Sequence, residues 1–189
     1  VDIKDSIYHD FKSVISDWGL TDYFTIQINF IRCNLTGAFV RFRGLDDSEK
    51  VKGITGFKRV VMEEISQFDE VDFKQIKKRL RGKQGQQIIG IFNPISEDHW
   101  IKTNVFDTEE LTEVDQQADA TDNGFKFEDW QIDAKWINAS GNTVILKSNY
   151  TNNYWIVGKW RGGVQVGGFV DQHVIDDFEK DKLTDYSYY

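Results

Sequence analysis

The sequence is poor in cysteine and proline: its 189 residues include one of each, Cys33 and Pro94. A lone cysteine excludes an internal disulfide and a cysteine-based zinc site, and it favours a reducing, cytoplasmic setting. The histidines, His9, His99 and His173, are too far apart for an HExxH-type metal motif. No apolar run approaches the roughly 20 residues that span a bilayer, and nothing resembles a signal peptide, so we expect no membrane contact.

Composition indicates one well-buried core, since 40% of the residues are hydrophobic and 29% are charged. The formal net charge of −8 argues against a surface that binds nucleic acid all over. It leaves room for a local basic patch. Such a patch is present in one short stretch: Lys74, Lys77, Lys78, Arg79, Arg81 and Lys83.

Helical spacing of apolar residues predicts a first helix in residues 7–19, with Gly19 as its stop. The segment "IQINFIRC" then alternates apolar and polar residues and changes phase at Ile31. This pattern predicts one strand with a bulge. A turn signal, "NLTG", and a second alternating segment, "AFVRFRG", complete a predicted hairpin.

Two largely apolar stretches predict interior strands at residues 60–63 and 87–92, each covered on both faces. An amphipathic segment between them predicts a helix over residues 73–81, with Asp69 as its N-cap and Gly82 as its stop. Together they predict a βαβ unit with adjacent, parallel, interior strands, one face of which the helix covers.

The remaining sequence predicts four further segments. Residues 108–124 are acidic and polar, as expected of a surface loop or an exposed helix. "TVILKSNY" predicts a short interior strand, and the glycine-rich "YWIVGKWRGGVQVGGFV" predicts a protruding hairpin. A C-terminal helix is expected at residues 171–183.

Two adjacent carboxylates, Glu63 and Glu64, stand where the first apolar run ends. Ligands of open parallel sheets gather at the carboxyl ends of the strands. Because adjacent strand residues point to opposite faces, one acid is expected to hold a metal ion and the other to orient a water molecule. Asn93 follows the next predicted strand. The alternative interpretation is two solvated acids at the point where a strand leaves the core.

The blocks "GLDD", "VVMEE" and "IFNP" occur in this order within residues 44–94, followed by "SNYTNN" and "FVDQHVIDDFEK". In this arrangement the sequence resembles the large terminase subunit of tailed phages, in the branch found in prophages of Gram-positive bacteria. The resemblance implies an α/β, P-loop NTPase-like fold of the additional-strand class. That fold has a mostly parallel sheet with flanking helices, here with a β-hairpin insertion.

By this resemblance, Glu63 corresponds to the Walker B acid that supports Mg²⁺, Glu64 to the catalytic glutamate that positions water, and Asn93 to the coupling motif. The implied cofactors are ATP and Mg²⁺, and the implied activity is ATP hydrolysis that drives double-stranded DNA into procapsids. The implied partners are the portal protein of the procapsid and the small terminase subunit. The family also implies a homo-oligomeric ring in the host cytoplasm, transiently on the procapsid.

The sequence departs from the family pattern in lacking a G-x-x-x-x-G-K-[ST] loop, so no phosphate-binding residue is assigned. It opens on Val1, and we expect the loop upstream in a longer product and the nuclease domain beyond this chain. The chain is then a single partial ATPase domain, 1–189, that is inactive alone. Its predicted core is 7–107 and 143–153, with insertions at 108–142 and 154–168.

Several alternatives stay open. Three roles are open for the basic residues of the helix predicted over 73–81. They form a face that is only solvated, they contact the DNA backbone, or one of them, Arg79 or Arg81, is an arginine finger. The whole chain is either part of a packaging ATPase or a non-catalytic binding or scaffold module of P-loop ancestry. A third hypothesis, independent of any resemblance, is a metal-dependent hydrolase that combines Glu63 and Glu64 with Asp46 or Asp47.

Overall fold

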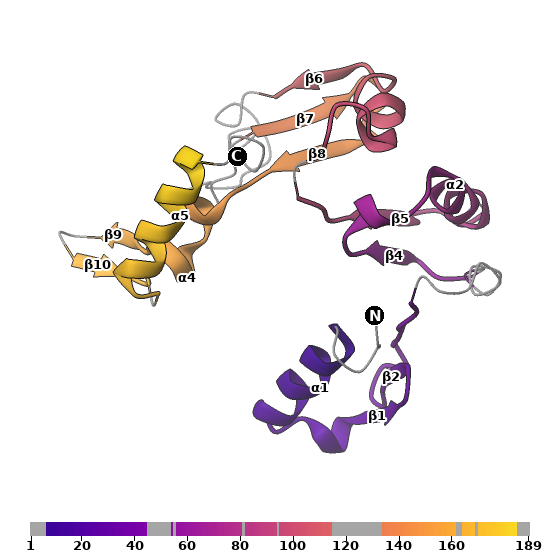
Figure 1. Ribbon diagram of the computed structural model, residues 1–189. Coiled ribbons are helices and arrows are strands. Elements are labelled where there is room, and N and C mark those ends of the chain that lie inside the picture. The colour runs from indigo at the N-terminus through magenta and orange to yellow at the C-terminus, as the bar shows by residue number, and fades with distance from the viewer. Residues whose placement is uncertain are drawn as a thin grey trace. The chain divides into compact units, whose positions relative to one another are not determined.

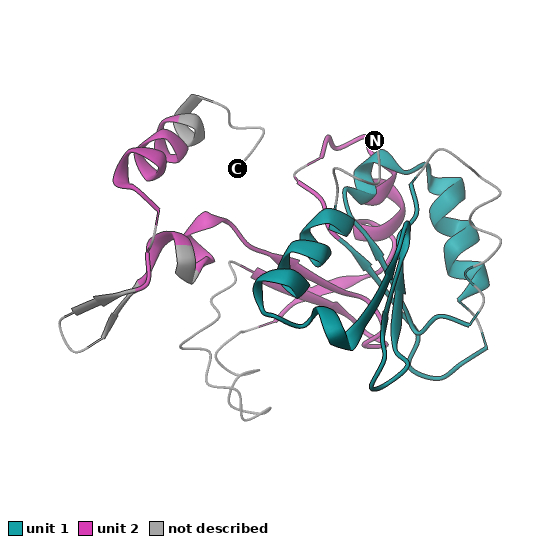
Figure 2. Ribbon diagram, turned by 90° about the horizontal axis from the view of Figure 1, so that it is seen from below, with its two compact units in different colours: residues 1–90 teal, residues 91–189 magenta. Residues whose placement is uncertain are grey.

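The computed structural model describes residues 7–44, 54, 56–80, 82–93, 95–114, 134–161, 164–168 and 170–184. Helices and β-sheets both occur in these ranges (Figure 1), which confirms the predicted α/β class. The chain divides into two compact units, Val1–Gly90 and Ile91–Tyr189 (Figure 2). In the ranges above, no helix combines the length and the apolar character needed to cross a bilayer.

The first unit contains a helix packed on a small antiparallel sheet, followed by a βαβ unit. Its helical elements are α1 (Ile7–Asp17), η2 (Thr21–Tyr23), η4 (Ile65–Gln67) and α2 (Glu70–Arg79). Its strands are β1 (Phe24–Gln27), β2 (Phe30–Cys33), β3 (Phe39–Arg41), β4 (Arg59–Met62) and β5 (Gln87–Gly90).

Helix α1 packs against the sheet formed by β1, β2 and β3 (Figure 1). Tyr8 and Ile15 lie seven positions apart, hence on one side of the helix, and both are buried with Ile31 of β2. The Tyr8 hydroxyl donates a hydrogen bond of 2.7 Å to the carbonyl oxygen of Gln27. Gly19, with a φ of 65°, ends the helix as predicted, because this left-handed conformation favours glycine.

The prediction of one bulged strand over "IQINFIRC" is wrong. The segment forms two antiparallel strands, β1 and β2, in which Gln27 faces Phe30 across a turn at Ile28 and Asn29. The change of phase in the hydrophobic pattern therefore marks a reversal of the chain. The pairing of β2 with β3 confirms the predicted hairpin, with Ile31 opposite Val40.

The βαβ unit is confirmed: β4 pairs parallel to β5, with Val60 beside Ile88, and α2 lies between the two strands in the sequence. Asp69 occupies the predicted N-cap position of α2 but makes no side-chain capping hydrogen bond. Acidic residues in the first turn and basic residues in the last turn both interact favourably with the helix dipole. Gly82 has a φ of 109° and follows the helix as its predicted stop.

The predictions of a mostly parallel sheet and of interior strands in the βαβ unit are wrong for the described residues. Among the strand pairs described, β4–β5 is the only parallel one, and it forms a two-stranded sheet in which both strands are edges. The remaining pairs are antiparallel. Short connections explain four of these pairs, β1–β2, β2–β3, β7–β8 and β9–β10, because a turn of a few residues can join antiparallel strands only.

The second unit contains a three-stranded antiparallel sheet of order β6-β7-β8, the β9–β10 hairpin and a C-terminal helix. Its strands are β6 (Leu111–Glu113), β7 (Ala134–Asn138), β8 (Val144–Lys147), β9 (Lys159–Arg161) and β10 (Val164–Val166). Its helical elements are η5 (Lys102–Phe106), η7 (Tyr150–Asn152), α4 (Tyr154–Val157) and α5 (Gln172–Thr184). The predicted hairpin is confirmed, whereas β8, predicted as an interior strand, pairs with β7 alone among the described strands.

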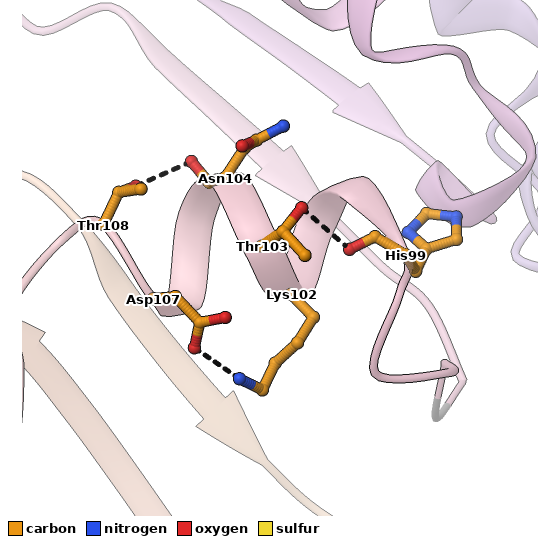
Figure 3. Close-up of polar contacts among 6 residues, drawn as sticks. All are labelled: His99, Lys102, Thr103, Asn104, Asp107 and Thr108. Atoms are coloured by element: carbon orange, nitrogen blue, oxygen red, sulfur yellow. Dashed lines mark hydrogen bonds and ion pairs between the residues drawn. The ribbon is translucent and has the colours of Figure 1, made fainter.

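A π-helical turn, η5, follows His99 and Trp100, and Figure 3 shows its polar contacts. The amide of Asp107 donates to the carbonyl of Lys102 at 3.0 Å, and the side chains of the same two residues form an ion pair. His99 Nδ1 accepts a hydrogen bond of 3.2 Å from the amide of Ile101. This contact ties the His99 ring to the start of the helical segment.

Candidate functional site

The two candidate carboxylates follow the last residue of β4 directly. Glu63 and Glu64 lie in a turn, and both are exposed to solvent. Because β4 and β5 run parallel, their carboxyl ends lie at the same edge of the sheet, with Met62 in register with Gly90. The acids therefore stand at the edge where open parallel sheets bind ligands.

Glu64 has a left-handed backbone conformation, with φ 50° and ψ 48°. Residues with a Cβ atom rarely adopt this conformation, which costs about 1–3 kcal/mol. The residue begins the short 3-10 turn η4, and its carbonyl accepts a hydrogen bond of 2.8 Å from the amide of Gln67. The surrounding turn thus holds Glu64 in a conformation that its own side chain disfavours.

Ile65 anchors this turn to the end of β5. Its side chain is buried, and it lies against Gly90 so closely that a Cβ atom at Gly90 would be 2.9 Å from Ile65 Cδ1 and 3.2 Å from Ile65 Cγ2. The missing side chain of Gly90 therefore makes room for Ile65. The carboxylates follow a buried Met62 and precede a buried Ile65, so both ends of the turn are fixed.

Both acids lie beyond β4, which ends at Met62, whereas the predicted strand included Glu63. The alternation of side chains along a strand consequently says nothing about their directions. What separates the two residues is the backbone: Glu64 is left-handed, whereas Glu63 is absent from the described non-glycine residues with positive φ.

The other predicted site residues are not all in the same unit. Asn93 is exposed and belongs to the second unit, whereas both acids belong to the first. Arg79 is the last residue of α2 and is half-buried. Arg81 lies outside the described residues, as do both aspartates of the third hypothesis, Asp46 and Asp47.

Within the described ranges, no three residues among the histidines, cysteines, aspartates and glutamates come together as a metal-binding cluster. A nucleotide-bound Mg²⁺ ion does not need such a cluster. It usually takes one or two protein carboxylates, and phosphate oxygens and water supply its other ligands. The two exposed carboxylates beyond β4 fit this requirement.

Cys33, the single cysteine, lies in the first unit. It is half-buried at the end of β2. Hydrogen bonds to the sulfur lower the pKa of the Cys33 thiol. The largest contribution comes from the hydroxyl of Thr36, and smaller ones come from the backbone amides of Thr36 and Leu35. The turn signal "NLTG" marks this loop in the sequence, but not its hydrogen bonds.

We predict that Thr36→Val slows the reaction of Cys33 with iodoacetamide at neutral pH. The thiolate is the reactive form, and loss of the hydroxyl raises the thiol pKa toward its ordinary value, so the thiolate fraction below that pKa falls. The rates of the two proteins should converge at high pH. Mass spectrometry across a pH series measures both, with Thr112→Val as the control. Equal rates at every pH would contradict the assigned hydrogen bond.

The fold and the turn after β4 define an α/β protein with two adjacent carboxylates at the carboxyl end of a parallel strand pair. The phage terminase large subunit family matches residues 2–189, and the chain therefore belongs to that family. Among solved structures, the large terminase of a thermophilic bacteriophage (crystal form 2) is similar, at 17% sequence identity and a TM-score of 0.43. That match covers 56% of this chain and 27% of the other.

The chain thus spans about a quarter of the length of the thermophilic phage terminase, since the match covers 27% of it. No curated protein matches the chain. Membership of the family confirms the resemblance drawn from the "GLDD", "VVMEE" and "IFNP" blocks.

Proposed function

We propose that this chain is part of the ATPase of a DNA-packaging motor, in which Glu64 positions the water that attacks ATP and Glu63 supports the metal ion. The observation that carries the proposal is the turn beyond β4, which presents two exposed carboxylates at the carboxyl end of a parallel strand pair. A water that attacks a γ-phosphate needs a positioned acceptor, and a fixed carboxylate supplies one.

The backbone of Glu64 supports its assignment as the catalytic residue. Strained, non-glycine conformations concentrate at functional sites, where the surrounding structure compensates for their cost. Here the burial of Ile65 against Gly90 and the hydrogen bond from Gln67 supply that compensation. A glycine would adopt the same conformation without strain, yet the position carries a carboxylate.

Mg²⁺ bound to ATP would be held by its phosphate oxygens and, directly or through water, by Glu63. When bound, it neutralises charge on the phosphates. The contribution of this chain is an oxygen ligand at Glu63 and a hydrogen-bond acceptor at Glu64. We assign Asn93 to coupling of hydrolysis to DNA movement, and Arg79 or Arg81 to an arginine finger or a DNA contact.

The finer fold assignment is part of the same proposal. The β4–α2–β5 unit belongs, in this view, to a P-loop NTPase-like sheet of the additional-strand class. Residues 1–189 form one partial ATPase domain, with insertions at 108–142 and 154–168. The proposed partners are double-stranded DNA, the portal protein, the small terminase subunit and further copies of the chain in a ring. The proposed location is the host cytoplasm, transiently on the procapsid.

The test is a Mg²⁺ titration of the Glu63→Gln variant in the full-length protein that contains this chain. The glutamine amide lacks the negative charge with which the carboxylate attracts the metal ion. The Mg²⁺ concentration for half-maximal ATP binding should therefore rise on the order of 10- to 100-fold. Excess Mg²⁺ should partly restore hydrolysis. Fluorescent ATP binding and single-turnover hydrolysis measure the two effects.

Glu113→Gln is the matched control, because Glu113 is an exposed carboxylate at the end of β6. It should leave the Mg²⁺ dependence unchanged. If Glu63→Gln and the wild type show the same Mg²⁺ dependence, Glu63 does not support the metal. If the wild type neither binds nor hydrolyses ATP, the non-catalytic scaffold interpretation replaces the ATPase.

A further inference from the structure

The β1–β2–β3 sheet has one face covered by α1 and another that is open to solvent. Ile31, Phe24 and Ile26 pack toward Tyr8 and Ile15 of the helix. Side chains alternate along a strand, so the residues between these belong to the opposite face. By the observed register, that face carries Thr25, Gln27, Phe30, Arg32, Phe39 and Arg41.

Aromatic rings form a continuous row on this open face. The Phe30 and Phe39 ring centroids are 5.3 Å apart, with 34° between the ring planes. Phe57, in the segment that leads to β4, meets Phe39 edge to face at 5.3 Å. These three phenylalanines are called the aromatic row below. The side chain of Phe39 is 47% exposed, although an open sheet face normally carries polar residues.

Two arginines flank the aromatic row. The guanidinium carbon of Arg41 lies 6.0 Å from the centre of the Phe30 ring, a cation–π geometry. Arg32 is opposite Phe39 in the register, and both arginines are exposed. Within the described residues, neither arginine forms an ion pair with a carboxylate. The chain has a net charge of −8, yet no carboxylate among the described residues neutralises the two arginines on this face.

We propose that the aromatic row, with Arg32 and Arg41, binds single-stranded DNA. Every base has a π face, so a ring exposed on a sheet, here Phe39 with the half-buried Phe30 and Phe57 beside it, can bind an unpaired base by stacking, and flanking arginines can bind the phosphates. A duplex keeps its bases stacked on each other and offers no such faces. The choice of DNA over RNA rests on the proposed packaging function, whereas the stacking surface itself does not involve Glu63 or Glu64.

The experiment measures fluorescence anisotropy of a labelled oligothymidine with the full-length protein, without ATP. Phe39→Leu keeps an apolar side chain but removes a stacking ring, and should weaken binding about fivefold or more. Arg41→Gln and Arg32→Gln should each weaken binding and reduce the slope of log K against log salt by about 0.7, as expected for one lost phosphate contact on a single strand.

Two control variants lie on α1, the helix that covers the opposite face of the sheet. Phe11→Leu removes a ring of similar exposure on α1, 42% against 47% for Phe39. Lys12→Gln removes a cation that lies 5.5 Å from the Tyr8 ring. Both should bind oligothymidine as the wild type does. Because the assay contains no ATP, its result is separate from the test of Glu63.

Three results would overturn the inference. The first is equal affinity of the Phe39, Arg32 and Arg41 variants and the controls for oligothymidine. The second is tighter binding of a duplex or of oligouridine than of oligothymidine. The third is a change of oligomeric state in Phe39→Leu, seen by sedimentation with DNA binding intact, which would make this face a protein interface. Arg32 and Arg41 are exposed, so their variants keep the test valid if Phe39→Leu melts at a lower temperature.

Discussion

Glu64→Gln, made in the full-length protein that contains this chain, is expected to lower single-turnover ATP hydrolysis by about 10²- to 10⁴-fold while ATP still binds. The amide keeps the size of the side chain and can still accept a hydrogen bond at one oxygen. It loses the negative charge that makes the carboxylate a good acceptor for the proton of the attacking water. Nucleotide binding and thermal melting, measured on the same samples, should match the wild type.

Glu110→Gln is a closely matched control for this prediction. Glu64 and Glu110 are the two described non-glycine residues with positive φ, 50° and 47°, and both are exposed. The two variants therefore change charge equally in the same backbone conformation. Glu110→Gln should hydrolyse ATP normally. Normal hydrolysis by Glu64→Gln would show that Glu64 does not position the water, and the roles of the two acids would have to be reassigned.

Glu64→Gly separates catalysis from strain at the same position. Glycine adopts the left-handed conformation without the penalty of a Cβ atom, so the variant should melt no lower than the wild type. Its hydrolysis should be lost together with the carboxylate. An unchanged or higher melting temperature together with lost hydrolysis would show that the native protein gives up stability at position 64 for activity.

Local patterns in the sequence were sufficient to predict the βαβ unit. The apolar runs at β4 and β5 are contiguous, α2 is amphipathic, and Gly82 has the positive φ expected of a stop. Each of these signals depends on near neighbours in the chain. They predicted the parallel direction of the pair because a helix between two strands of one sheet gives a parallel crossover.

The sequence was less informative where non-local pairing decides the structure. The phase change at Ile31 fits a bulge and a hairpin equally well, and only the pairing of Gln27 with Phe30 separates them. The prediction of a mostly parallel sheet came from the family resemblance. It was wrong for the described strands because the antiparallel pairs around β2 and β7 outnumber the one parallel crossover.

The candidate site was predictable in position but not in geometry. Adjacent acids after an apolar run marked Glu63 and Glu64, since two like charges have no role inside a strand. The left-handed backbone of Glu64 could not be predicted, because glutamate has no preference for that conformation. The next residue, Ile65, packs on Gly90, and these two residues are far apart in the sequence.

Met62→Ala should be the most disruptive single change in the βαβ unit. Met62 is 2% exposed, and truncation of a buried methionine typically costs about 2–5 kcal/mol of unfolding free energy. Because the chain divides into two units, the effect is best measured locally, by hydrogen exchange of the β4 and β5 amides. A loss of about 2 kcal/mol corresponds to roughly 30-fold faster exchange.

Val61→Ala is the comparison that gives this prediction its meaning. Val61 neighbours Met62 in β4, but its side chain is 56% exposed and points to the other face of the pair. Its truncation should cost less than about 1 kcal/mol. The contiguous apolar run predicted that both faces are covered, whereas the structure buries only the Met62 side. Equal destabilisation by the two variants in the full-length protein would contradict the one-sided burial and restore the interior strand expected from the sequence.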